Sequence, residues 1–281
     1  MLNWINAENY TMETFLLFDR WVLRFLLAEP TWGPWHSQDG LDYKTEMARA
    51  LSRYPHVVRF CRKKAPECIP FLDEIAKISI DGLTDAEARR SETMILQFHE
   101  SFVVYAYPAV MDQLNYIRDW DPQRLYDLVD LKDKVVLDVG AGTGRLSFAA
   151  AKVAKRVYAS EPCDTLREYM RDKIEREHIV NMKVLDGVVM NLPYEDNTFD
   201  VVMSGHVVGD SYDEEIAEMT RITKNGGYIV CCNGDDGIKR ASANRELLSR
   251  GFESLVHEGC NGETIYGYRK LVIKGRGDAV D

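Results

Sequence analysis

A glycine-rich loop, Gly140 to Gly144, comes directly after a predicted buried strand and directly before a predicted helix. Glycine lets the backbone turn sharply and approach a bound molecule closely. The start of a helix also presents free N–H groups to a ligand. The segment KVVLDVGAGTGRLSFAA therefore predicts a ligand-binding turn. The loop alone does not identify the ligand, because dinucleotide-binding folds use a glycine loop too.

Three features of this segment separate the candidate ligands. The dinucleotide pattern needs its third glycine at the position of Arg145, whose bulk would block the close approach of helix and pyrophosphate. Asp138, at the end of the strand, would repel a pyrophosphate but suits a cation such as an amino group. Glu161, at the end of the next predicted strand, stands where carboxylates accept two hydrogen bonds from a ribose diol. The pattern therefore disfavours a dinucleotide.

The same segment resembles motif I of the class I S-adenosylmethionine-dependent methyltransferases. Further along, LPYEDNTFDVVMSGHVV is similar to the stretch LPF-x-D-x-(S/T)-F-D-V-V of the subgroup that includes menaquinone and ubiquinone methyltransferases and many small-molecule enzymes. The resemblance covers about residues 130–273 and leaves residues 1–130 unmatched. It implies S-adenosylmethionine as the cofactor and methyl transfer as the reaction.

The resemblance also implies which residues bind the cofactor. It implies that Asp138 lies beside the amino group of the cofactor's methionine part. It also implies that this part is lined by the small residues of the loop, which are Gly140, Ala141, Gly142 and Gly144. These residues match the family pattern one by one. We therefore expect the loop and the strand before it to hold the amino-acid end of the cofactor.

Further residues match the ribose, adenine and sulfonium positions of the family. The resemblance implies that Glu161 binds the ribose hydroxyls and that Pro162 and Cys163 lie beside the adenine. Gly205 and His206, after the fourth strand, match the position that faces the reactive sulfonium. The adenine edge matches three consecutive residues, Asp186, Gly187 and Val188. Two extra residues separate this group from the following Leu-Pro pair, which departs from the usual spacing.

Methyl transfer is an in-line displacement on a sulfonium carbon, so the protein must align the nucleophile and sometimes remove a proton. His206 is the candidate base or orienting group, because histidine titrates near neutral pH; the alternative is that it only packs or contacts cofactor. Asp210 is a candidate substrate contact, or it caps the helix that starts near Tyr212. Further candidates at this edge follow the fifth strand and are Asn233, Asp235 and Asp236. The acids there could hold a hard cation or a cationic substrate, but we expect no metal.

The elements that must position these residues follow from the alternation of strand and helix patterns after residue 133. This alternation predicts an α/β fold, a Rossmann-like, seven-stranded and mainly parallel sheet. A GCNGE turn makes the last two strands an antiparallel hairpin. The expected strands are 134–139, 156–160, 182–186, 199–204, 226–232, 252–258 and 264–273. The expected helices are 144–153, 163–177, 211–223 and 239–250.

Residues 1–130 carry helical patterns and predict a helical cap that selects the substrate, in front of a cofactor-binding catalytic domain at 131–281. The loop that holds Trp32, Trp35 and His36 has no regular face to bury, so these side chains are candidates for a lid or pocket wall. Tyr105 is a further candidate, from a long helix expected to run from the Thr84 capping box to about residue 106. Tyr10 to Ala28 is expected to form another helix.

Composition limits the partners. The 281 residues carry a net charge of -10, which would repel a phosphate backbone, so we expect no nucleic-acid partner. A basic group at Arg59, Arg62, Lys63 and Lys64 is best interpreted as a solvated helix face. We expect no membrane span, since apolar runs are short and interrupted by charges. Six scattered cysteines predict reduced thiols and a cytoplasmic location. The sequence does not set the oligomeric state.

The leading functional hypothesis is a methyltransferase that acts on a small molecule, because the cap is rich in aromatic residues and the overall charge is negative. Two alternatives stay open. One is a protein methyltransferase that acts on basic segments, and the other is a non-catalytic protein that binds S-adenosylmethionine for sensing or interaction. The acceptor and its reacting atom are not determined by the sequence, because fold-level likeness does not fix a substrate.

Overall fold

The computed structural model describes residues 9–28, 42–233, 240–259 and 262–275, without the side chains of residues 100–102. By its internal contacts the chain divides into two compact units, residues 1–111 and 112–281. Among the described helices, none has the length and apolar character needed to cross a membrane.

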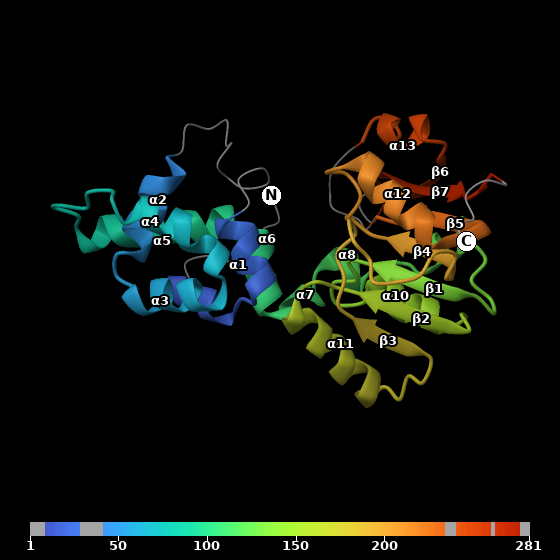
Figure 1. Ribbon diagram of the computed structural model, residues 1–281, viewed down its shortest axis with the longest axis horizontal. Coiled ribbons are helices and arrows are strands. Elements are labelled where there is room, and N and C mark those ends of the chain that lie inside the picture. The colour runs from blue at the N-terminus through green and yellow to red at the C-terminus, as the bar shows by residue number, and fades with distance from the viewer. Residues whose placement is uncertain (1–8, 29–41, 234–239, 260–261, 276–281) are drawn as a thin grey trace. The chain divides into compact units, whose positions relative to one another are not determined.

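The second unit is built on a sheet whose strand order is β3-β2-β1-β4-β5-β7-β6 (Figure 1). The first five strands pair in parallel with their neighbours, and β7 pairs antiparallel with both β5 and β6. This confirms the expected mainly parallel sheet with an antiparallel C-terminal hairpin. The strands are β1 (Val135–Val139), β2 (Arg156–Ser160), β3 (Met182–Leu185), β4 (Phe199–Ser204), β5 (Thr223–Cys231), β6 (Glu253–Glu258) and β7 (Thr264–Leu271).

Two apolar cores cover the two faces of this sheet. Successive side chains of a strand point to opposite faces, so Val136 of β1 belongs to one core and Leu137 to the other. Helices α9 (Gln123–Leu128), α10 (Arg145–Ala151) and α11 (Asp164–Arg176) contribute to the first core. Helices α12 (Tyr212–Ile222) and α13 (Arg245–Ser249) contribute to the second. Burial on both faces explains why the central strands are almost continuously apolar.

Helix α13 is shorter than the expected helix 239–250. The side chain of Asn244 accepts hydrogen bonds from the backbone N–H groups of Glu246 and Leu247, at 2.9 and 3.3 Å. This is the geometry of an N-cap, which leaves the preceding residue outside the helix. The described residues before Asn244 are therefore part of a connection from β5 rather than of the helix.

The first unit is helical, as expected. Its elements are η2 (Met12–Leu17), α1 (Arg20–Leu27), α2 (Tyr43–Leu51), α3 (Pro55–Lys64), η4 (Pro66–Cys68), α4 (Ile69–Ile75), α5 (Asp85–Phe98), α6 (Glu100–Ala106) and α7 (Pro108–Met111). The single helix expected from Tyr10 to Ala28 is wrong. The Asp19 carboxylate accepts from the backbone N–H of Val22 at 2.8 Å and so starts α1 afresh.

The long helix expected up to residue 106 is interrupted at His99. The capping box at Thr84 is present as expected. His99, however, leaves helical geometry and buries its ring, where Nε2 lies 2.7 Å from the hydroxyl of Tyr43. Burial lowers the pKa of His99 to about 3, so the ring is neutral. The break is explained by this buried hydrogen bond, which joins α2 to the end of α5.

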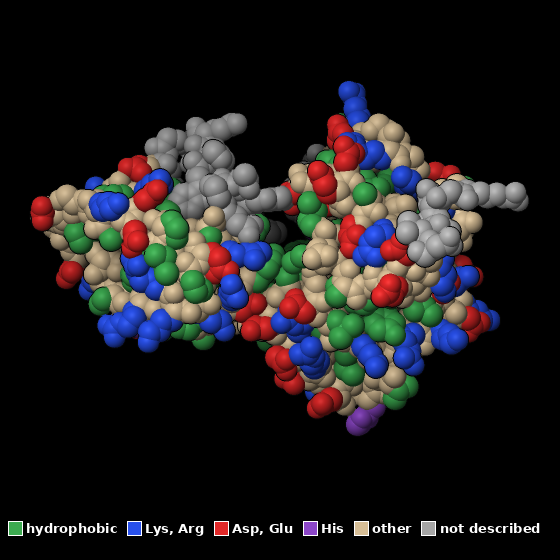
Figure 2. All heavy atoms as spheres, in the orientation of Figure 1, with side chains coloured by type: hydrophobic (Ala, Val, Ile, Leu, Met, Phe, Trp, Pro, Cys, Tyr) green, Lys and Arg blue, Asp and Glu red, His purple; other side chains and the backbone are tan. Residues whose placement is uncertain are grey.

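The basic residues of α3 lie on a largely solvated face. Arg59, Lys63 and Lys64 are exposed, and the guanidinium of Arg62 forms an ion pair with Asp73 at 2.5 Å. Figure 2 shows Lys and Arg side chains gathered on the N-terminal unit where Figure 1 places α3. This arrangement has the character of a solvated helix face.

The contacts of residues 112–130 join them to the sheet unit, whereas the sequence suggested a boundary after residue 130. Leu125 and Leu128 of α9 are fully buried in the first core of the sheet. Asp112 accepts hydrogen bonds from Tyr169 and Lys173 of α11, at 3.0 and 3.2 Å. Helix α8 (Asn115–Arg118) lies in the same stretch.

Candidate functional site

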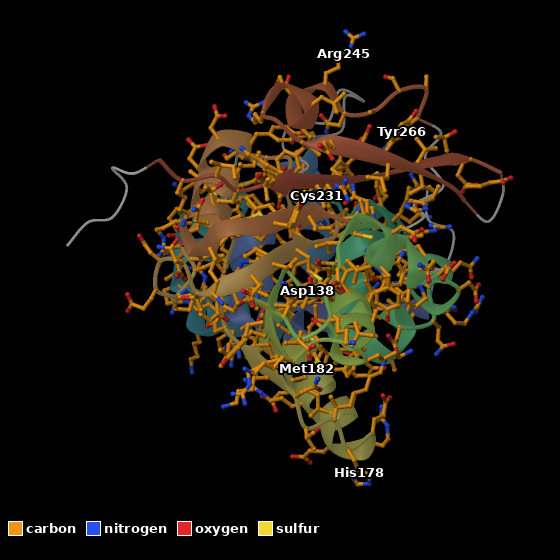
Figure 3. The ribbon with its side chains drawn as sticks, turned by 90° about the vertical axis from the view of Figure 1, so that its right-hand side faces the viewer. Asp138, His178, Met182, Cys231, Arg245 and Tyr266 are labelled. Carbon is orange, nitrogen blue, oxygen red and sulfur yellow. The ribbon has the colours of Figure 1, made fainter. Side chains whose placement is uncertain are left out.

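The strand order reverses its direction between β1 and β4. From β1 the chain adds β2 and β3 on one side, and from β4 it adds the remaining strands on the other side. The topological switch point of the sheet therefore lies between β1 and β4. Ligands of open α/β sheets bind outside the carboxyl ends of the strands at such a point. The loops that follow β1 and β4 are the two that meet there. Asp138 lies within β1, in register with Ala159 of β2 and Met203 of β4 (Figure 3).

The loop after β1 depends on glycine geometry. Gly140, Gly142 and Gly144 have φ angles of 65°, 59° and 93°, a left-handed region in which other residues are strained. The N–H groups of Gly140 and Ala141 both donate to the carbonyl of Ser160 in β2, at 2.8 and 3.1 Å. A Cβ added to Gly140 would come within 2.4 Å of Val207 Cγ2. The loop thus lies tightly against β2 and against the loop that follows β4.

Asp138 presents a buried carboxylate oxygen at this loop. The residue is 1% exposed, and its Oδ2 accepts a hydrogen bond from Ser147 Oγ at 2.6 Å. Its Oδ1 is buried and has no hydrogen-bond partner. Burial raises the pKa of Asp138 to about 7, against the opposing effects of Ser147 and Arg145. An unpaired buried carboxylate oxygen is costly, so this atom fits a cationic donor such as the ammonium of a bound amino acid.

Glu161 is held against the same loop. Its Oε2 accepts from the N–H of Gly142 at 2.9 Å, and its Oε1 accepts from the N–H of Cys163 at 3.0 Å. The side chain is buried, and these backbone donors fix the plane of the carboxylate. A carboxylate can accept about four hydrogen bonds, so the arrangement is compatible with a diol as a further donor.

Arg145 has a part in the site that the sequence did not reveal beyond its bulk. Its buried guanidinium stacks 4.6 Å from the centre of the Trp120 ring, and Nη2 donates to the Cys232 carbonyl at 2.9 Å. Nη1 is buried without a hydrogen-bond partner. Burial lowers the pKa of Arg145, and the charge of Asp138 opposes this shift. Two opposite buried charges therefore flank the start of α10, each with one unsatisfied atom.

Gly205 and His206 follow β4, as predicted. A Cβ on Gly205 would lie 2.6 Å from Arg145 Nη2, so the glycine makes room for the guanidinium. His206 is exposed and has φ of 62°, and its backbone N–H donates to Asn233 Oδ1 at 2.9 Å. Its ring meets Tyr116 edge-on at 6.1 Å between centroids. Asn233, a candidate expected at this edge after the fifth strand, is thus brought together with His206.

The backbone of His206 is strained in a way that marks the position. Among the described residues, the other non-glycine residues with positive φ are Asp133, His178 and Asn197, which precede strands. His206 is the one that follows a strand, at the ligand-binding edge. Strain of this kind costs about 1–3 kcal/mol and collects at functional sites.

Asp210 does not cap α12. The N-cap residue is Ser211, and its side chain makes no capping hydrogen bond. Instead the buried Glu215 accepts from the N–H groups of Gly209 and Asp210, at 2.9 and 3.4 Å. Partial burial and the nearby charge of Glu215 raise the pKa of Asp210 to about 6. The alternative that Asp210 serves as a helix cap is therefore wrong.

The residues expected at the adenine lie at the ends of β2 and β3. The side chain of Asp186 is 75% exposed and pairs with Arg167 at 3.2 Å. The same Arg167 nitrogen donates to the carbonyls of Glu161 and Pro162, at 2.6 and 2.7 Å, and so links the two strand ends. A Cβ on Gly187 would lie 3.1 Å from Ser160 Oγ. Val188 follows in a short bridge to Asn191.

The candidate substrate residues of the N-terminal unit are only partly described. Trp32, Trp35 and His36 lie outside the described residues. Tyr105 of α6 stacks on Trp21 of α1, with 6.1 Å between ring centroids. Asp235 and Asp236, in the second unit, also lie outside the described part of the chain.

The sequence has relatives among methyltransferases. Residues 137–231 match the model of the methyltransferase domain family. The chain is 32% identical over 105 residues to a demethylmenaquinone methyltransferase of Geobacillus sp. (strain WCH70), which covers 36% of this chain and 45% of that protein. For the demethylmenaquinone methyltransferase of Staphylococcus haemolyticus the identity is 32% over 131 residues, covering 43% and 54%. The matched region thus spans about half the length of these relatives.

A solved structure shares the fold. A SAM dependent methyltransferase from Aquifex aeolicus superposes with a TM-score of 0.50 and 19% identity, covering 60% of this chain and 98% of that one. The match to the family model is confined to residues 137–231, and the likeness to this structure agrees with the strand order of the sheet. The expected Rossmann-like fold is confirmed, and the expected resemblance to methyltransferases is confirmed over residues 137–231.

Proposed function

We propose that this protein transfers a methyl group from S-adenosylmethionine to a small-molecule acceptor. The observation that carries the proposal is the buried, unpartnered Oδ1 of Asp138 beside the glycine loop at the switch point of the sheet. S-adenosylmethionine, when bound, supplies an electrophilic methyl group on a sulfonium centre. The relatives that carry the name demethylmenaquinone methyltransferase support a small molecule as the acceptor.

The cofactor site of the proposal uses the residues at the ends of β1 and β2. Asp138 would accept from the α-ammonium, and Glu161 would accept from the ribose hydroxyls. The backbone of Gly140, Ala141, Gly142 and Gly144 would line the methionine part. Pro162, Asp186, Gly187 and Val188 would border the adenine, where the exposure of Asp186 favours a peripheral contact. The tight loop supports this assignment, because the backbone approaches the ligand where side chains would obstruct it.

The acceptor side of the proposal lies after β4. Gly205 would lie near the sulfonium, where it makes room for the guanidinium of Arg145. His206 would orient the acceptor or take its proton. The left-handed backbone of His206 supports a functional role, because such strain persists where the surrounding structure maintains it. Asp210 would contact the acceptor, and its raised pKa suits proton exchange near neutral pH.

We assign substrate selection to the helical N-terminal unit, through Trp32, Trp35, His36 and Tyr105. Its dense aromatic content supports this role, since such side chains suit the walls of small-molecule pockets. We also propose a cytoplasmic location, which is supported by the described cysteines, since Cys61, Cys68, Cys163, Cys231 and Cys232 form no disulfide.

The test is calorimetric titration with S-adenosylhomocysteine, S-adenosylmethionine and NADH. We expect binding of both sulfur ligands and none of NADH. Asp138→Asn should weaken the sulfur ligands about tenfold to hundredfold, because it removes a charge-assisted hydrogen bond. Asp172→Asn, on an exposed face of α11, is the matched control and should bind as the parent does.

Unchanged affinity in Asp138→Asn would refute the site assignment. Tight cofactor binding without any methyl transfer to a panel of small acceptors would instead favour a non-catalytic binding protein. Transfer of labelled methyl groups to basic peptides, with none to small molecules, would favour the protein methyltransferase alternative.

A further inference from the structure

A polar cavity of about 300 Å³ lies beside the carboxyl ends of β4 and β5, within the second unit. Val208 and Asn233 line it from the loops that follow these strands, and Tyr266 and Tyr268 line it from β7. In Figure 3, Cys231 and Tyr266 mark this region of the sheet, above Asp138 in that view. The cofactor residues assigned above do not line the cavity. It is therefore a second place where this edge of the sheet can hold a molecule.

The cavity is linked to the position of His206. Asn233 lines the cavity, and its Oδ1 accepts the backbone N–H of His206 at 2.9 Å. Val208 is two residues beyond His206 in the same loop. A group bound in the cavity thus contacts the residues that hold the candidate reactive position.

The polar groups that line the cavity are arranged as hydrogen-bond donors. The Tyr268 hydroxyl oxygen accepts from the backbone N–H of Asn244 at 2.8 Å, so its own O–H proton is directed to another acceptor. The side-chain oxygen of Asn233 accepts the hydrogen bond from His206, so the side-chain N–H groups are the ones that Asn233 can offer to a ligand. Arg240 can only donate. The hydroxyl of Ser242 can serve either way.

The charge of the lining agrees with this polarity. Among the described residues that line the cavity, Arg240 brings a full positive charge and none is a carboxylate. This contrasts with the protein as a whole, whose net charge is -10. Donor-rich surroundings with a guanidinium recognise carboxylate or phosphate oxygens.

Part of the cavity is apolar. Val208, Cys231, Leu247 and Ile265 line it together with the polar groups, and the first three belong to or pack on the second core of the sheet. Ligand sites of this size combine apolar walls with a few placed polar groups. The expected occupant therefore carries an apolar portion as well as an anionic group.

We propose that this cavity binds the anionic group, a carboxylate or a phosphate, of a methyl acceptor that also has an apolar portion. Arg240, Tyr268 and Asn233 hold the anion, and the apolar residues hold the adjoining part of the acceptor. The inference rests on the proposed function for the role of acceptor, but the anion site itself stands on the cavity alone.

The test uses the full chain, saturated with S-adenosylhomocysteine, in calorimetric titrations with benzoate, phenyl phosphate and benzamide. The first two probes share the apolar ring and differ in the anion, and benzamide is the neutral counterpart. We expect one of the two anions to bind at least about tenfold more tightly than benzamide, since hydrogen bonds to charged groups are stronger than those between neutral groups. The preferred anion identifies the acceptor group as carboxylate or phosphate.

Two variants assign the binding to this cavity. Arg240→Gln should weaken the preferred anion at least about tenfold, and Tyr268→Phe should weaken it severalfold, with benzamide unaffected by either. Arg245→Gln is the matched control, because Arg245 is exposed on α13 and does not line the cavity. Equal binding of benzamide and both anions, no binding of either anion, or full anion binding in Arg240→Gln would each overturn the proposal.

The same titrations separate this inference from the proposed function. Anion binding that depends on Arg240, in a protein that fails to bind S-adenosylhomocysteine, would leave the anion site in place and remove the methyltransferase assignment. Cofactor binding without anion binding would leave the methyltransferase assignment in place and would overturn the anion site.

Discussion

The loops after β1 and β4 meet at one edge of the sheet, yet they reach left-handed backbone geometry by different means. The first uses Gly140, Gly142 and Gly144, which adopt positive φ with little strain. The second loop places His206 at φ of 62°, a conformation that is strained for any residue with a side chain. The difference suggests two roles. In the proposed function, the first loop brings backbone close to the cofactor, whereas the second holds a side chain at the same edge of the sheet.

The largest expected effect is that of Gly140→Ala. A Cβ there would meet Val207 Cγ2 at 2.4 Å and would also strain a backbone at φ of 65°. We expect a loss of stability of about 2–4 kcal/mol, and at least about a hundredfold weaker binding of S-adenosylhomocysteine, if the loop lines the cofactor. Denaturation by urea and calorimetry measure the two effects.

Gly226→Ala is the matched control for that substitution. Gly226 has φ of 79° but nothing within 4 Å of an added Cβ, so it should cost only about 1 kcal/mol through strain. Cofactor affinity should not change. If Gly140→Ala bound the cofactor as well as Gly226→Ala does, the role given to the first loop would be wrong.

A smaller effect is expected from pH, through Asp138. Its pKa in the free protein is raised to about 7, and binding of an ammonium requires the ionised form. Below that pH the proton must be expelled, so affinity should fall by about tenfold per pH unit. Above about pH 8 the α-amino group of the ligand begins to lose its charge. Calorimetry from pH 5.5 to 9 should therefore show an optimum near neutral pH.

Asp138→Asn sharpens this expectation, because it removes the acidic limb of the profile while leaving the alkaline limb. Stability should follow the opposite course in the parent protein. A carboxyl group whose pKa is raised on folding stabilises the native state below its unfolded pKa of about 3.9, and this contribution is lost as the pH rises towards 7. An acidic limb that survives in Asp138→Asn would assign the titration to another group.

The smallest expected effect separates the backbone of His206 from its ring. His206→Ala and His206→Gly both remove the imidazole, but only glycine relieves the left-handed strain. His206→Gly should therefore be more stable than His206→Ala by about 1 kcal/mol in urea denaturation. Affinity for S-adenosylhomocysteine should be equal in the two. Equal stability would mean that the loop relaxes when the ring is removed, and the contrast with the glycine loop would fail.

The sheet could be predicted from the sequence because its signals are local and agree with one another. Strand β1 is a short apolar run that ends in a glycine loop, and β4 is a similar run after a turn. Hydrophobic periodicity and turn residues fix such elements over a few positions. The cofactor loop was found for the same reason, since its glycines are needed by the backbone geometry itself.

The remaining features depend on contacts between distant residues. The break at His99 follows from a hydrogen bond to Tyr43, which is 56 positions away. The buried guanidinium of Arg145 depends on Trp120 and on the carbonyl of Cys232. Neither arrangement has a local pattern in the sequence, because tertiary contacts override helix propensity and determine which charges become buried. The pattern of charged and apolar residues therefore could not predict the break at His99 or the position of the Arg145 guanidinium.

The position of β7 inside the sheet has a consequence for biosynthesis. This strand is made after β6, yet it lies between β5 and β6 and pairs with both. Until Thr264–Leu271 have left the ribosome, the edge of β5 has no partner on that side. An uncovered strand edge invites pairing with other chains. Slow translation of Thr264–Leu271 would therefore prolong the period in which the β5 edge of the nascent protein is exposed to such pairing.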